Sequence, residues 1–124
     1  LRVDVFKAGH HGSNTASSEG LLRAVNPKIS VVSVGTAAAS PKTKSYRLPN
    51  QSVMETLEQL TVNDLKDEWE TQIFPDEKPA GAKKEKPQVF TSHKEIYITS
   101  SDGTIVLRTD GRSVEAGSYE QKNQ

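Results

Sequence analysis

Residues 28–35, KISVVSVG, form the most strand-like stretch of this sequence. β-Branched isoleucine and valine fill most of its positions, and these side chains favour a pleated, buried strand. The run is nearly continuous in apolar residues, which is typical of a strand that is buried on both faces of a sheet. Pro27 separates it from the preceding segment, because a proline disfavours helical geometry at the residue before it. The stretch therefore predicts a central strand of an α/β fold.

The residues before this strand predict a strand, a loop and a helix. Residues 1–7 carry apolar side chains among charged neighbours and predict a strand that starts immediately. Ser17 or Ser18 is expected to cap a short helix, with Glu19 in its positively polarised first turn. The buried side of this helix is expected to consist of Leu21, Leu22 and Val25. The order is thus strand, loop, helix, strand.

The second half of the sequence is less regular. Residues 36–50 predict a loop, after which Asn50 is expected to cap a helix with Val53, Leu57 and Leu60 on one face and capping-box spacing between Ser52 and Glu55. A second helical piece is predicted over residues 63–74. Residues 75–88 contain three prolines and seven charged residues and predict a mobile surface insertion. Residues 95–111 predict a hairpin around Asp102-Gly103, and residues 112–124 a frayed tail.

Composition limits the possible functions. The chain has 124 residues, with sixteen basic residues balanced by sixteen acidic ones, so no broad positive field would hold nucleic acid. It has no cysteine, which excludes disulfides and thiolate metal ligands. No apolar run approaches the roughly 18 residues of a membrane-spanning helix, so a soluble segment without membrane contact is expected. The apolar content of 33% is low for an independent domain and predicts that the chain is part of a larger fold.

The most unusual feature is the histidine doublet in residues 9–13, GHHGS. It follows the first predicted strand, and strand ends in α/β folds are where ligands and metals collect. Neutral imidazole is also the commonest metal-ligating side chain. Adjacent residues of an extended strand point to opposite faces, so one histidine is expected to be a ligand and the other to have a separate role. The alternative is a pair of loop histidines whose ring nitrogens bind backbone carbonyls.

A longer stretch around the doublet carries a family resemblance. Residues 4–35, DVFKAGHHGSNTASSEGLLRAVNPKISVVSVG, resemble the C-terminal half of metallo-β-lactamase-fold hydrolases, most closely the hydrolase domain of ComEC-type DNA-uptake competence proteins and its stand-alone relatives. Residues 100–111, SSDGTIVLRTDG, are similar to the final hairpin of that family. The resemblance implies an αββα sandwich, of which residues 1–111 supply the C-terminal half. It leaves the compartment open, with the cytoplasm implied for a stand-alone protein and the cell surface or periplasm for a competence protein.

The resemblance also implies roles for particular residues. His11-Gly12-Ser13 matches the His-x-Ser of a late zinc ligand, so His11 is implied to bind metal, with two zinc ions in the complete domain and manganese as an alternative. His10 is implied to line the site and to orient or protonate the substrate. Ser13 either hydrogen-bonds a substrate oxygen or caps the turn. A register shifted by one residue would make His10 the ligand instead.

Two departures from the family pattern affect the predicted function. The upstream His-x-His-x-Asp-His loop and the bridging aspartate do not occur in this sequence, so this chain alone is expected to be inactive and to need an N-terminal half from the same protein or a separate chain. Leu48 replaces a histidine of the relatives, whereas the neighbouring Arg47 can grip a phosphate, with Lys42 and Lys44 nearby in sequence. The implied function is metal-assisted hydrolysis of phosphodiesters such as nucleic acid. The alternative is a degenerate, non-catalytic interaction or scaffolding domain.

Overall fold

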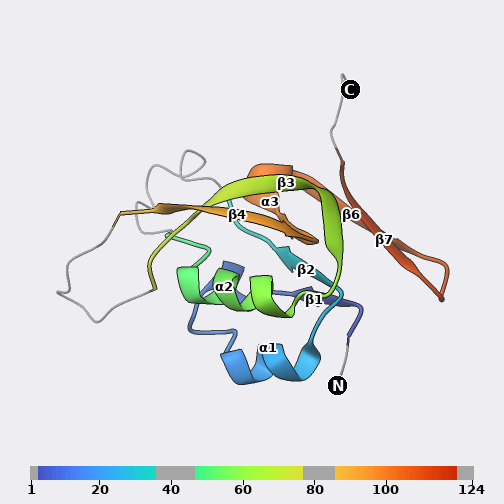
Figure 1. Cartoon of the computed structure of the whole chain (residues 1–124), viewed down its shortest axis with the longest axis horizontal. Coiled ribbons are helices and arrows are strands. Elements are labelled where there is room, and N and C mark those ends of the chain that lie inside the picture. The colour runs from blue at the N-terminus through green and yellow to red at the C-terminus, as the bar shows by residue number, and fades with distance from the viewer. Residues whose placement is uncertain (1–2, 36–46, 77–85, 120–124) are drawn as a thin grey trace.

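The computed structural model describes residues 3–35, 47–76 and 86–119, and the predicted loop lysines Lys42 and Lys44 lie outside these ranges. Helices and strands alternate irregularly along the chain, as Figure 1 shows. The elements are β1 (Val5–Lys7), η1 (Gly9–Gly12), α1 (Glu19–Val25), β2 (Ile29–Val32), α2 (Gln51–Leu60), β3 (Asp64–Ile73), β4 (Gln88–Lys94), β5 (Ile96–Ile98), α3 (Thr99–Asp102), β6 (Thr104–Thr109) and β7 (Val114–Tyr119).

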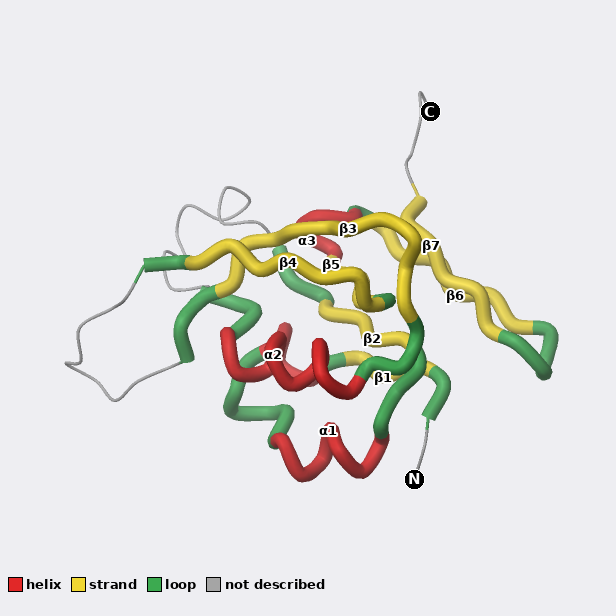
Figure 2. The backbone as a smooth tube through the Cα atoms, in the orientation of Figure 1, coloured by secondary structure: helices red, strands yellow, loops and turns green. Residues whose placement is uncertain are grey.

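The centre of the fold is a three-stranded parallel sheet in the order β1-β2-β5. The middle strand β2 is buried at all four positions, which confirms the buried strand predicted from KISVVSVG. Helices α1 and α2 lie together on one side of the molecule, and the long β3–β4 ribbon arches across the other (Figures 1 and 2). The core lies between these layers. Its fully buried members include Leu22, Val32, Val53, Met54, Leu57, Ile96 and Ile98.

Helix α1 forms where the sequence predicts it. The hydroxyl of Ser18 accepts a hydrogen bond from the Leu21 backbone N–H at 3.2 Å, and Asn26 ends the helix in the left-handed conformation. Leu22 is fully buried, but Leu21 is 45% exposed, contrary to the predicted buried side. The reason is that neighbouring residues diverge by about 100° around a helix, and a helix of seven residues presents only a narrow stripe to its neighbour.

Helix α2 also forms as predicted, but its N-terminus is capped by an unexpected residue. The Asn50 side chain makes no capping hydrogen bond to the helix. Instead, the carboxylate of Asp76, which follows β3, accepts a hydrogen bond from the Ser52 backbone N–H at 2.9 Å. The predicted capping box is not formed, since Glu55 accepts a hydrogen bond from the Gln51 side chain. Asp76 therefore performs the capping that the sequence assigns to Asn50.

This cap gives a testable prediction. Replacing Asp76 with alanine is expected to lower the free energy of unfolding by about 1 kcal/mol, because the Ser52 N–H loses its acceptor. Urea denaturation followed by circular dichroism measures the change. The control is Asp76→Asn, which keeps a side-chain oxygen at the same place and should lose less stability. Equal losses in both variants would contradict the capping role.

Residues 64–73 form a strand, so the second helix predicted over residues 63–74 is wrong. β3 (Asp64–Ile73) pairs antiparallel with β4 over most of its length. The less exposed side chains of β3 fall at odd positions, namely Leu65, Trp69, Thr71 and Ile73. This spacing of two is the period of a strand, and the many charged residues between these positions obscured it in the sequence. The Trp69 indole N–H donates to the Lys94 carbonyl at 2.8 Å and holds the ribbon together.

The C-terminal elements also differ from the prediction. No hairpin forms around Asp102-Gly103, because β5 joins the parallel sheet beside β2 and is followed by the short helix α3. The hairpin instead joins β6 to β7, so residues 114–119 of the predicted frayed tail are a strand. Its turn is fixed by the Asp110 carboxylate, which accepts hydrogen bonds from the backbone N–H groups of Arg112 and Ser113. The second Asp-Gly pair of the sequence, and not the first, makes the tight turn.

Just after the end of β2, the main chain at Val34 is held by the side chain of Thr99. The Thr99 hydroxyl accepts a hydrogen bond from the Val34 N–H at 2.8 Å and donates one to the Val34 carbonyl at 2.9 Å.

Residues 77–85 of the predicted insertion lie outside the described residues, whereas Pro75 is buried and Gln88 begins β4.

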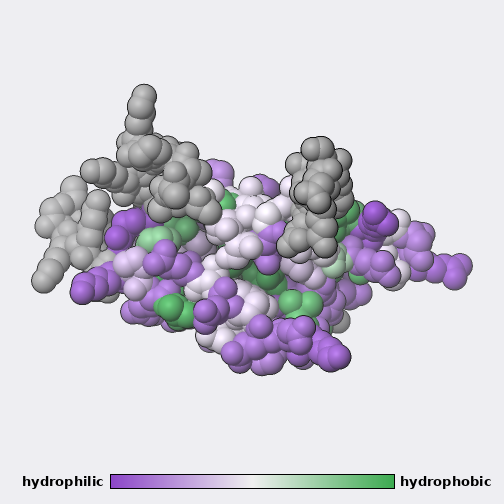
Figure 3. Space-filling model, turned by 90° about the horizontal axis from the view of Figure 1, so that it is seen from above, coloured by the Kyte–Doolittle hydropathy of each residue, from purple (hydrophilic) through white to green (hydrophobic). Residues whose placement is uncertain are grey.

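The described surface is mainly polar. On the face of the molecule drawn in Figure 3, the hydrophobic areas are small and separate. The exposed large apolar side chains come from different elements and are Leu21, Val62, Val89 and Leu107. Scattered residues of this kind are normal in soluble proteins. In the described part of the chain, no helix is long and apolar enough to cross a lipid bilayer.

Candidate functional site

The histidine doublet lies in a left-handed turn at the C-terminal end of β1. His10 has φ 45° and His11 has φ 57°, and the following Gly12 has φ 84°. Left-handed geometry is uncommon for residues other than glycine, and such strain persists only where the surroundings enforce it. The premise that the two side chains point to opposite faces of an extended strand is therefore wrong. Their rings are both exposed, with centroids 6.2 Å apart.

The ring of His11 is held by the end of the neighbouring strand. Its Nδ1 lies 2.6 Å from the carbonyl oxygen of Ser33, which follows β2. A carbonyl oxygen only accepts hydrogen bonds, so Nδ1 carries the proton in the neutral ring, and Nε2 has the lone pair. The alternative prediction, in which the histidine ring nitrogens bind backbone carbonyls, is thus correct for the Nδ1 of His11. The other nitrogen is available as a ligand or a base.

His10 belongs to a small hydroxyl network. Its Nδ1 lies 3.2 Å from the Thr15 hydroxyl, which in turn lies 2.8 Å from the Ser13 hydroxyl. The Ser13 hydroxyl also accepts a hydrogen bond from the Thr15 backbone N–H, and Ser13 is fully buried. Of the two roles predicted for Ser13, this geometry favours the bracing of the turn over contact with a substrate.

A second segment, residues 48–50, fixes the histidine turn from the side. The Gly12 carbonyl accepts a hydrogen bond from the Asn50 N–H at 2.9 Å, and the Asn14 N–H donates to the Asn50 Oδ1 at 2.8 Å. Gly12 lies so close to Pro49 and Val32 that a Cβ atom on Gly12 would be 2.7 Å from the Pro49 Cβ. The Leu48-Pro49 peptide bond is cis. Two segments that are far apart in sequence thus form one site.

Arg47 lies at the edge of this second segment. Its guanidinium carbon lies 5.5 Å from the centre of the Phe74 ring, within the range of a cation–π interaction. Its carbonyl accepts a hydrogen bond from the Asn50 side-chain amide. The Leu48 side chain is buried in the core at 8% exposure. The structure thus brings His10, His11 and Ser13 together and places Arg47 on the adjoining segment.

Three residues of this site were not predicted as parts of it. Asn50 was interpreted only as a helix cap, and Ser33 and Thr15 were assigned no role. The Ser33 contribution is a backbone carbonyl, which no side-chain pattern reveals. In the described ranges, no group of three or more histidine, aspartate and glutamate side chains is arranged to hold a metal ion. These residues therefore offer oriented imidazoles and not a full ligand set.

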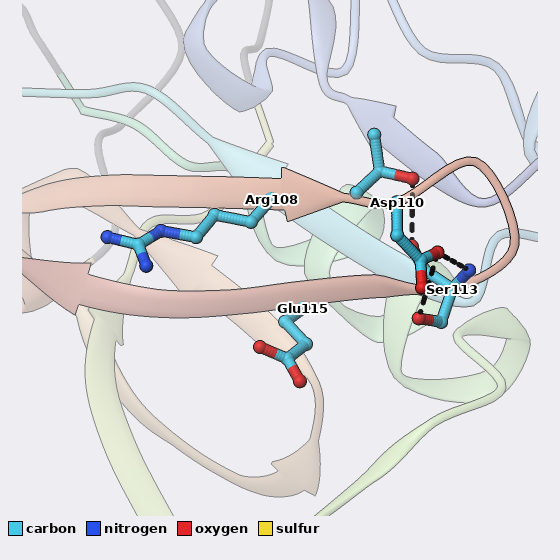
Figure 4. A pocket seen from close by; sticks show the side chains of 5 residues that line it. Arg108, Asp110, Ser113 and Glu115 are labelled. Carbon is cyan, nitrogen blue, oxygen red and sulfur yellow. Dashed lines mark hydrogen bonds between the residues drawn. The ribbon is translucent and has the colours of Figure 1, made fainter.

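A shallow pocket of about 240 Å³ lies elsewhere, on the β6–β7 hairpin that projects from the fold (Figures 1 and 4). It is lined by Arg108, Thr109, Asp110, Ser113 and Glu115. The backbone N–H of Ser113, followed by that of Arg112, lowers the pKa of Asp110 because both stabilise its charged form. These bonds belong to the hairpin turn, so the pocket follows from the turn and not from a second cluster of reactive groups.

Comparison with known proteins relates the chain to segments of two bacterial proteins. It is 39% identical over 56 residues to Recombination protein 2 of Haemophilus influenzae, a match covering 45% of this chain and 6% of the relative. It is 30% identical over 66 residues to ComE operon protein 3 of Bacillus subtilis, covering 53% of this chain and 8% of the relative. No family model and no solved structure matches the chain. The similarity agrees with the competence-protein part of the predicted resemblance, while the metallo-β-lactamase fold stays a prediction.

Proposed function

We propose that this chain is part of a bacterial protein of DNA uptake and that His11 supplies one imidazole ligand to a zinc-dependent site that hydrolyses phosphodiesters. The observation that carries the proposal is the hydrogen bond between the His11 Nδ1 and the Ser33 carbonyl. Histidines that bind metal through one nitrogen usually donate the other N–H to a carbonyl or carboxylate. The names of the two partial relatives support the DNA context.

The available donors fit zinc better than a hard cation. Imidazole suits zinc, whereas magnesium and calcium prefer oxygen ligands, and manganese is the alternative ion. The remaining ligands would come from residues beyond the described ranges or from another chain in the αββα arrangement. When bound, zinc would supply a hydroxide nucleophile at neutral pH by lowering the pKa of its water to about 7.

The residues around His11 have separate parts in this proposal. The exposed ring of His10 lies beside that of His11 and orients the substrate or transfers a proton to it. The Thr15 hydroxyl restrains the His10 ring from one side. Arg47, held on the Phe74 ring, provides positive charge for a phosphate oxygen. Ser13 supports the turn through its buried hydroxyl and has no substrate-binding role in this proposal.

The proposal is tested by metal binding to the intact protein and two histidine variants. Replacing His11 with alanine is expected to weaken zinc binding by about 100- to 1,000-fold, because one of four ligands carries roughly a quarter of the 10–16 kcal/mol measured for zinc sites in peptides. Zinc titration and hydrolysis of bis(p-nitrophenyl) phosphate and single-stranded DNA are the measurements. The control is His93→Ala, which removes an exposed imidazole that pairs with Glu68 at 3.3 Å on the β3–β4 ribbon. It should bind zinc and hydrolyse phosphodiesters as the wild type does.

A second candidate function is a non-catalytic interaction domain. It is favoured by Leu48, which packs into the core at the place where relatives of the resembled family carry a polar histidine. Wild-type protein that binds neither zinc nor manganese, and in which His11→Ala changes nothing, would favour this candidate over the hydrolase.

A further inference from the structure

Asn50 is a completely buried polar residue whose amide group is fully engaged. Its Oδ1 accepts a hydrogen bond from the Asn14 backbone N–H at 2.8 Å. Its Nδ2 donates to the carbonyls of Arg47 and Pro75, each at 3.2 Å. The side chain is 0% exposed. A buried amide with both donors and its oxygen in use is expensive to replace, because each lost partner leaves a desolvated polar group.

The backbone of Asn50 is engaged on both sides as well. Its N–H donates to the Gly12 carbonyl, and Asn50 forms a parallel bridge with Phe74 at the end of β3. The residue therefore lies between the histidine turn on one side and the end of the β3–β4 ribbon on the other. Of the two residues that it holds, Gly12 follows His11 directly and Asn14 lies two residues further along the chain.

The helix cap provides an independent sign of this role. An asparagine before a helix normally accepts hydrogen bonds from the first turn of that helix. Here the Asn50 side chain faces the histidine turn, and Asp76 caps α2 in its place. The two consecutive residues Pro75 and Asp76, which follow β3, thus have separate contacts: the Pro75 carbonyl accepts a hydrogen bond from the Asn50 amide, and Asp76 caps α2.

We propose that Asn50 is the positioning residue of His11. By fixing Gly12 and Asn14, it holds the left-handed turn in which the His11 Nδ1 meets the Ser33 carbonyl. The strain at two adjacent left-handed residues requires such an external restraint. The benefit to metal binding rests on the proposed function, whereas the effect on the ring geometry of His11 does not.

The test compares Asn50→Ala with a buried polar variant outside the site. Thr61→Val is the control, because Thr61 is 1% exposed and its hydroxyl bonds only the Ser30 hydroxyl among the described side chains. The ring tautomer of His11 is read from long-range proton–nitrogen NMR correlations in the 124-residue chain. The wild type and Thr61→Val should have the proton on Nδ1, whereas Asn50→Ala should contain both tautomers. In the intact protein, Asn50→Ala should weaken zinc binding by about 10-fold, the lower end of the range for supporting residues.

A second measurement does not depend on the stability of the variant. In the wild-type chain, the backbone amide of Asn14 should exchange with solvent as slowly as core amides, since Asn50 covers it. An Asn14 amide that exchanges like an exposed loop amide would overturn the inference. So would an unchanged His11 tautomer in a folded Asn50→Ala variant. A wild type that binds no zinc, with a His11 ring that still responds to Asn50→Ala, would refute the proposed function and support the positioning role.

Discussion

Replacing Gly12 with alanine is expected to destabilise the protein by about 2–5 kcal/mol. Two costs combine at this position. Gly12 has φ 84°, a left-handed conformation that costs a residue with a Cβ about 1–2 kcal/mol. The added Cβ would also lie 2.7 Å from the Pro49 Cβ and 3.1 Å from a Val32 methyl group, an overlap that costs about 1–3 kcal/mol.

The matched control for Gly12 is Gly111 in the β6–β7 turn. Gly111 has a similar φ of 91°, but a Cβ there would have no neighbour within 4 Å. Gly111→Ala is therefore expected to cost only the conformational part, about 1–2 kcal/mol. Urea denaturation of both variants separates the two costs. If Gly12→Ala were no more destabilising than Gly111→Ala, the contact between the histidine turn and Pro49 would not be tight, and the description of the site would be wrong.

The second large effect is expected at Leu22. Leu22→Ala should lower the free energy of unfolding by about 3 kcal/mol, because it removes a large side chain from the core and leaves a cavity. Leu22 is 0% exposed and belongs to the core cluster with residues of α2 and of the parallel sheet. Thermal or urea denaturation of the 124-residue chain measures the loss.

The adjacent leucine is the control for this experiment. Leu21 lies in the same helix and is 45% exposed, so Leu21→Ala should change the stability by no more than about 0.5 kcal/mol. Both substitutions have the same effect on helix propensity, and the difference between them reports burial alone. Similar losses in the two variants would mean that α1 is rotated relative to the orientation described above.

The sequence predicted those elements whose pattern is local. The buried strand at residues 29–32 and the helices at 19–25 and 51–60 follow from runs of β-branched residues, a capping serine and a 3.6-residue spacing. β3 was missed because its alternation is interrupted by charged residues, and its strand form depends on pairing with β4, about twenty residues later. β5 lies within the first strand of the predicted hairpin, but its parallel pairing with β2 was missed because three apolar residues do not reveal a parallel partner.

The histidines of the candidate site were predictable from the sequence, but the geometry of the site and the residues that brace it were not. The doublet of His10 and His11 is visible in the sequence, and its family context suggested a metal site. The left-handed turn depends on Asn50, which is 36 residues away from the Asn14 amide that it binds. The Ser33 carbonyl that orients His11 is 22 residues away. Such long-range contacts are set by the packing of the sheet, and a single sequence does not encode them in any local pattern.

Two hydrogen bonds between Thr99 and Val34 hold the main chain next to Ser33, whose carbonyl binds His11. The hydroxyl satisfies both backbone groups of Val34, so the main chain is anchored one residue beyond the Ser33 carbonyl. The carbonyl that receives the His11 ring is therefore tied to residues that follow both neighbouring strands of the sheet, and a substitution at Thr99 would reach the histidine turn through the backbone of Val34.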